Sequence, residues 1–172
     1  VYAVNETFMP VKDGKKVTVD DMTMAIIRYE NGVYAQWLWT KVAPGRKIEV
    51  RTIYGSKGSI SNEELQIQKL KGVERYELRS IERMMHETSK KQVEEWFPAG
   101  IRDTFAIELY DFYRAITEGK QPEVNGVEAY RDMAIPLSFY ESAYLNTPVK
   151  VKDVENLKVE YYQNEINDRL GI

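Results

Sequence analysis

The strongest constraint in this chain is a pair of extended segments joined by one tight turn. Residues 18–29 and residues 33–42 are rich in the β-branched and aromatic side chains that favour strands, and Glu30-Asn31-Gly32 separates them. An Asn-Gly pair favours positive φ at both central positions of a hairpin turn. The two segments therefore predict an antiparallel hairpin, and the sheet that contains it must bury at least one face.

Turn signals recur at short intervals through the rest of the first half. Turns are expected at residues 12–16, 44–45, 55–58 and 71–72, where glycine, proline and charged residues gather. Between them, strands are expected over residues 1–8, 47–54, 59–61, 65–70 and 73–81. Such spacing is typical of a meander, so the sheet should be mostly antiparallel.

The second half has the pattern of helices. Apolar residues recur at helical spacing from Arg102 to Glu118, and Gly119 provides a stop. A second helix is expected over residues 126–145, with a kink or offset at Pro136, and late strands over residues 149–151 and 157–161. The predicted fold class is α+β, with a large, mostly antiparallel sheet and helices packed on one face. We expect a single domain over residues 1–172.

Both faces of the strand at residues 33–40 carry apolar groups. Tyr34 and Leu38 lie on the face opposite Trp37 and Trp39. Because two helices can cover only one side of a sheet, the second side is expected to pack against a second copy of the chain or against another domain. The alternative is that Tyr34 and Leu38 lie under a loop.

Composition excludes several classes of function. With 24 basic and 27 acidic residues the net charge is −3, whereas a general binder of nucleic acid or acidic membranes has a basic surplus. No apolar run approaches the roughly 20 residues of a membrane helix. The chain has no cysteine, which excludes disulfides and thiolate zinc sites and suits a cytoplasmic protein.

No cofactor or metal site is expected in these residues. A glycine-rich phosphate loop between a strand and a helix is absent, and so is the Walker pattern. His86 is the single histidine, and the paired carboxylates are sequence neighbours that point to opposite faces of a strand. His86 is interpreted as a surface or packing residue, with a role as proton donor or substrate contact as the alternative.

The candidate substrate-binding residues lie in two places. Trp39, Lys41 and Arg46 surround the turn after the central strand, where cations can donate to hydroxyls and an aromatic face can cover an apolar ring face. Trp96 and Arg102, ahead of the first helix, form a second candidate pair. The alternatives are a solvated turn with Trp39 in the core, and Trp37 with Trp39 as core or interface rather than a sugar platform.

Two long segments resemble a known family. They are residues 21–61, DMTMAIIRYENGVYAQWLWTKVAPGRKIEVRTIYGSKGSIS, and residues 105–151, FAIELYDFYRAITEGKQPEVNGVEAYRDMAIPLSFYESAYLNTPVKV. In order and spacing they are similar to the C-terminal half of the glucose–fructose oxidoreductase and inositol dehydrogenase family. In that family a Rossmann domain precedes a sheet-rich domain for substrate binding and assembly.

The resemblance implies that catalysis and cofactor binding belong to an upstream domain. The dinucleotide fingerprint, the Glu-Lys-Pro motif and an assisting Asp–His pair would lie upstream, so no catalytic residue is expected in this chain. The intact protein would use NAD or NADP to oxidise or reduce a sugar, cyclitol or related polyol, and this chain alone would be inactive and bind no dinucleotide. Its partners would be the Rossmann domain, the small polyol and further copies of the chain through the open sheet face.

Two other hypotheses remain at this point. The chain would instead be a stand-alone dimeric module for ligand binding or assembly, without catalysis, or a non-catalytic family member that senses a ligand. The lack of an initiator methionine and the start inside an apparent strand favour a segment of a longer protein.

Overall fold

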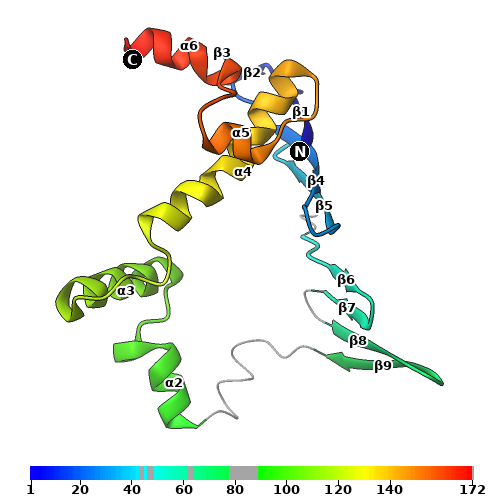
Figure 1. Cartoon of the computed structure of the whole chain (residues 1–172), viewed down its shortest axis with the longest axis vertical. Coiled ribbons are helices and arrows are strands. Elements are labelled where there is room, and N and C mark those ends of the chain that lie inside the picture. Colours follow the sequence, from blue (N-terminus) through cyan, green and yellow to red (C-terminus); the bar gives the residue numbers. More distant parts are fainter. Residues whose placement is uncertain (43–44, 46–48, 62–63, 78–88, 172) are drawn as a thin grey trace. The chain divides into compact units, whose positions relative to one another are not determined.

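The computed structural model describes residues 1–42, 45, 49–61, 64–77 and 89–171 (Figure 1). The chain divides into two units. The first comprises Val1–Gly45 with Glu123–Ile172, and the second comprises Arg46–Pro122.

The first unit contains the predicted hairpin in a three-stranded sheet. β1 (Tyr2–Glu6), β4 (Met22–Arg28) and β5 (Tyr34–Thr40) pair in the order β1-β4-β5, and both pairings are antiparallel. The turn differs from the expectation, because Gly32 has φ 83° whereas Asn31 keeps a negative φ. Instead, Asn31 Oδ1 accepts a hydrogen bond from the Val33 amide at 3.2 Å. The loop thus uses an asparagine side chain in place of a second positive φ.

A short second hairpin follows β1. β2 (Val11–Lys12) pairs with β3 (Lys15–Lys16), and the turn between them has positive φ at Asp13 and Gly14. This confirms the turn predicted over residues 12–16.

Three helices complete the first unit: α4 (Gly126–Leu145), α5 (Val151–Glu155) and α6 (Tyr161–Leu170). α4 has the predicted bounds. It begins with a capping box, in which Asn125 and Glu128 bond each other's backbone amides, and it ends at Asn146 in the left-handed region.

The late strands predicted over residues 149–151 and 157–161 are wrong. Val149 is extended and exchanges backbone hydrogen bonds with Val1, both at 2.7 Å, but α5 begins two residues later. Leu157 has φ 57°, which no strand contains, and α6 begins at Tyr161. Val149 and Val151 have strand-like side chains, but tertiary contacts decide their structure.

The core of the first unit lies between the sheet and α4. Ala3, Ala25 and Ile27 from the strands pack with Phe139 from α4, and the Trp37 ring lies 6.4 Å from the Phe139 ring. Figure 1 shows β1 and β4 beside the C-terminal half of α4. The helix covers one face of the sheet, as predicted.

A buried serine fastens the helix to the sheet. Ser142 is 0% exposed, and its Oγ accepts a hydrogen bond from the Ala3 amide at 3.0 Å. The same hydroxyl donates to the Thr147 carbonyl at 2.7 Å, just beyond the end of α4. One side chain thereby satisfies two backbone groups that the fold has removed from water.

The opposite face of the sheet is open. Tyr34 and Leu38 are 64% and 61% exposed, so no described loop covers them. In the paired register Leu38 stands opposite Met24, and Met24 stands opposite Val4. These three side chains form an exposed apolar row across all three strands.

The second unit contains a four-stranded antiparallel meander. Its strands are β6 (Ile53–Gly55), β7 (Gly58–Ile60), β8 (Glu64–Lys69) and β9 (Gly72–Glu77), in sequence order. A Cβ at Gly58 would lie 2.0 Å from the Gln66 carbonyl oxygen, which explains a glycine at that position. Within residues 49–55 the strand expected over residues 47–54 begins only at Ile53.

Helical elements follow in the second unit: α2 (Lys90–Trp96), the 3₁₀ turn η1 (Pro98–Gly100) and α3 (Thr104–Glu118). Asp103 caps α3 by accepting from the Ala106 amide at 2.9 Å, and Gly119 ends it in the left-handed region. The α+β class with antiparallel strands is confirmed. The described strands form three separate sheets, of three, two and four strands.

We expect Ser142→Ala to destabilise the first unit by about 2–3 kcal/mol, because it leaves the Ala3 amide and the Thr147 carbonyl without their buried partner. Urea unfolding followed by circular dichroism measures the loss.

The matched control is Ser138→Ala. Ser138 is equally buried and lies one turn earlier in α4, but its hydroxyl donates only to the Ile135 carbonyl of its own helix. Its removal should cost under about 1 kcal/mol, since that carbonyl belongs to the helical ladder. Equal losses for the two variants would show that the contact between β1 and α4 does not depend on Ser142.

Candidate functional site

Two predicted site residues lie together at the end of β5. The Lys41 ammonium lies 5.4 Å from the centroid of the Trp39 ring, in a cation–π contact. Trp39 is 38% exposed, so its ring is not enclosed in the core. The Lys41 amide donates to the Asp21 carbonyl at 2.8 Å, which continues the pairing of β5 with the chain before β4.

Polar side chains of β1 and β4 extend this group. Thr23 stands opposite Trp39 in one pairing and opposite Asn5 in the other. The Thr23 hydroxyl donates to Asp20 Oδ2 at 3.1 Å. Asn5 Oδ1 is buried and finds no hydrogen-bond partner among the described residues. The end of the sheet therefore presents a carboxylate, a hydroxyl and an amide next to the cation and the aromatic ring.

Tyr140 of α4 adds a phenol near the polar side chains at this end of the sheet. Burial raises the pKa of the Tyr140 phenol, and the neighbouring Asp20 carboxylate raises it further, followed by Tyr162. The phenol therefore keeps its proton at neutral pH and can act as a hydrogen-bond donor. The Tyr140 ring also stacks on the Tyr162 ring of α6, with centroids 4.9 Å apart and an interplanar angle of 25°.

A buried carboxylate holds α6 against α4. Glu141 is 3% exposed, and its oxygens accept hydrogen bonds from the Tyr162 amide at 3.1 and 3.2 Å and from the Gln163 amide at 3.4 Å. The negative charge lies at the positive end of the helix dipole. Sequence analysis missed this role, because Glu141 and Tyr162 are 21 positions apart and no local capping signal connects them.

A cavity of 310 Å³ lies between α4, α5 and α6. Met133, Leu137, Val154 and Leu157 give it mainly apolar walls, and Glu141 and Tyr162 lie at its edge. Its wall includes α6, so the contact between Glu141 and α6 also maintains this cavity.

The other predicted candidates are not joined to this group. Trp96 ends α2 and Arg102 precedes α3, and both belong to the second unit. Arg46 and His86 lie outside the described residues. In the described part of the chain no three histidine or carboxylate side chains gather as a metal site.

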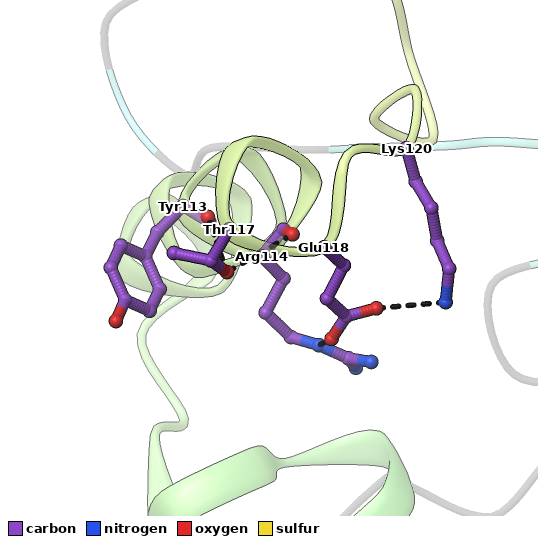
Figure 2. A network of polar contacts seen from close by, with 5 residues as sticks. All are labelled: Tyr113, Arg114, Thr117, Glu118 and Lys120. Carbon is purple, nitrogen blue, oxygen red and sulfur yellow. Dashed lines mark hydrogen bonds and ion pairs between the residues drawn. The ribbon is translucent and has the colours of Figure 1, made fainter.

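The last turn of α3 holds a carboxyl group with a strongly lowered pKa, that of Glu118. Arg114 Nε donates to Glu118 at 2.7 Å and Lys120 Nζ donates at 2.8 Å, and these hydrogen bonds lower the pKa of Glu118 to about 2 (Figure 2). The Thr117 hydroxyl bonds back to the carbonyls of Tyr113 and Arg114. This network lies at the surface, within α3 and the residues just after its end, so it accounts for local helix structure and suggests no chemistry.

Within the described residues no helix combines the length and the hydrophobicity needed to cross a bilayer.

The first unit combines an antiparallel sheet with a helix packed on one of its faces. The family described as "Oxidoreductase family, C-terminal alpha/beta domain" matches residues 2–151. The chain therefore belongs to the C-terminal domain of the glucose–fructose oxidoreductase and inositol dehydrogenase family, which confirms the resemblance seen in its sequence.

Solved structures agree with this assignment. The chain is similar to levoglucosan dehydrogenase in complex with NADH and L-sorbose, at 26% identity and a TM-score of 0.63, over 87% of this chain and 43% of that one. It is also similar to the oxidoreductase domain protein from Kribbella flavida, at 23% identity and a TM-score of 0.64, over 85% and 42%. The chain thus spans less than half the length of these structures. No curated protein sequence matches it.

We expect Glu141→Gln to loosen α6, because the neutral amide interacts less strongly with the helix N-terminus than the carboxylate does. Hydrogen exchange of the amides in residues 161–170 should accelerate roughly tenfold, which corresponds to about 1.4 kcal/mol.

Glu165→Gln is the control. Glu165 is exposed on α6 itself and pairs with Arg169 across one turn, a contact of small value. If both variants exchange at the rate of the unchanged protein, Glu141 does not hold α6.

Proposed function

We propose that this chain is the substrate-binding and assembly domain of an NAD(P)-dependent oxidoreductase that acts on a sugar, cyclitol or related polyol. The observation that carries the proposal is the family match over residues 2–151. The similarity to a levoglucosan dehydrogenase bound to NADH and L-sorbose supports the substrate class.

Among the described residues, the two longest helices offer no free N-terminus for the phosphates of a dinucleotide. Phosphates are commonly bound at a glycine-rich loop that opens a helix. Here the N-termini of α3 and α4 are occupied by their own caps, Asp103 and Asn125 with Glu128, and the acidic groups among them would repel phosphate. NAD or NADP would therefore be held by an upstream Rossmann domain. The part of this chain would be to bind the polyol and to exclude water from the pocket.

The open face of the three-stranded sheet is the proposed assembly surface. The row formed by Val4, Met24 and Leu38 is continued by Ile26 and Tyr2 in the next register position, and all five side chains are exposed. Removing so continuous an apolar surface from water would stabilise a contact with a second copy of the chain. We place the intact protein in the cytoplasm, in keeping with its lack of cysteine.

We expect the full-length polypeptide to oxidise or reduce at least one member of a panel of sugars, cyclitols and linear polyols with NAD(H) or NADP(H). This chain alone should bind neither dinucleotide in calorimetric titration. Dinucleotide binding by this chain would contradict the proposal. A full-length polypeptide that lacks turnover on every member of the panel would favour a non-catalytic binding module.

We expect Leu38→Asp to lower the association state in sedimentation velocity. A carboxylate at the centre of an apolar contact loses its hydration without gaining a partner, so the dissociation constant should rise at least tenfold.

Val11→Asp, in the β2–β3 hairpin, introduces the same charge at an exposed position away from the open face and should leave the oligomer intact. An unchanged, folded oligomer of Leu38→Asp would remove Leu38 from the interface.

A further inference from the structure

Asp20 and Asp21 are neighbours with different hydrogen-bonding environments. The two oxygens of Asp21 accept from the Phe8 and Met9 amides at 2.9 and 2.8 Å, and the residue is 7% exposed. Asp21 thereby fixes the chain between β1 and β2. Asp20 is only partly buried, and the hydrogen bond described for it with a measured distance comes from the Thr23 hydroxyl. Because a carboxylate offers about four acceptor positions, Asp20 keeps acceptor capacity toward a ligand.

No counterion is described for Asp20 among the residues of the structure. The Lys41 ammonium at this end of the sheet lies over the Trp39 ring. A partly buried carboxylate can accept charge-assisted hydrogen bonds from neutral O–H donors, and these replace hydration that burial has removed.

Tyr140 supplies a second polar group near Asp20, whose carboxylate contributes to the raised pKa of the Tyr140 phenol. The ring is held by its stack on Tyr162, and the phenol oxygen can accept a hydrogen bond from a further hydroxyl. Trp39 adds an exposed apolar ring face at the position opposite Thr23. Carboxylate, phenol, ammonium and indole together match the alternating polar edges and apolar faces of a polyhydroxylated ring.

From this arrangement we infer that Asp20, together with Tyr140, binds a pair of adjacent hydroxyl groups on a neutral polyol. The inference rests on the proposed function and narrows it. Asp20 and Asp21 place two carboxylates at this end of the sheet, beside the one ammonium of Lys41 that lies over the Trp39 ring. Such a field opposes phosphorylated sugars and sugar acids.

The C-terminal helix supports this site from outside the residues that the family matches. The family match ends at residue 151, whereas α6 begins at Tyr161. Tyr162 stacks on the Tyr140 ring, and Glu141 holds the start of α6 next to it. Tyr162 and Glu141 are therefore positioning residues, which limit the rotamers of Tyr140 without touching the polyol.

The test uses the full-length protein with Asp20→Asn, Tyr140→Phe and the control Asp13→Asn. Asp13 lies in the β2–β3 turn at φ 50°, a conformation that asparagine tolerates, so the control changes the same charge outside the site. Asp20→Asn keeps an acceptor for the Thr23 hydroxyl, and Tyr140→Phe keeps the stack on Tyr162. Both variants should therefore unfold at nearly the temperature of the unchanged protein.

For the best neutral polyol, KM and the calorimetric dissociation constant should rise about tenfold in Asp20→Asn and about threefold in Tyr140→Phe. The kcat should change less than KM, and Asp13→Asn should change neither. The effect of Asp20→Asn should vanish for one monodeoxy analogue of that polyol, which lacks the hydroxyl that Asp20 binds. D-glucose should bind at least tenfold more tightly than D-glucose 6-phosphate.

The outcomes separate this inference from the proposed function. Turnover of a neutral polyol with no change of KM in Asp20→Asn would overturn the inference and leave the proposed function standing. Binding that depends on Asp20 without turnover on any polyol would support the inference and contradict the oxidoreductase proposal. If the full-length protein binds none of the neutral polyols, both are wrong.

Discussion

The contact between the C-terminal half of α4 and strand β1 determines what the rest of the first unit can do. Ala3 and Ala25 have side chains small enough for the helix to approach the sheet closely, and Ser142 replaces the water that this approach removes. Because the helix is fixed in this position, Tyr140 near its end meets the polar end of the sheet. A looser contact would leave Asp20, Thr23 and Tyr140 as unrelated surface groups.

Because successive side chains of β4 point to opposite faces of the sheet, one set serves the core and the polar site, and the other serves assembly. Thr23, Ala25 and Ile27 face α4, whereas Met24 and Ile26 face outward. The inward set supplies the core and, at one end, the polar group beside Trp39. The outward set supplies the apolar row that we assign to assembly. A shift of register by one residue would exchange the two sets, so binding and assembly depend on the same strand pairing.

The sequence-based predictions were correct where local sequence signals determine the structure. The helix predicted over residues 126–145 and the central hairpin predicted at Asn31-Gly32 agree with the structure. The predictions failed where distant contacts decide. α6 depends on Glu141, and the segments predicted as late strands pass into α5 at Val151 and α6 at Tyr161, with Val149 alone paired to Val1. Trp39 and Lys41 were predicted as neighbours, but Asp20 and Tyr140 are 120 positions apart and meet only through the packing of α4.

The boundary of the family match separates shared from individual features of this domain. The sheet and α4 lie inside residues 2–151, which explains why structures at 23–26% identity still superpose with TM-scores above 0.6. The fold depends on a few small core residues, helix caps and the strand register, so the residues at other positions can vary widely. α6 lies outside the match. Because α6 holds Tyr140 through a ring stack, it can change which hydroxyl pattern the site accepts without disturbing the sheet.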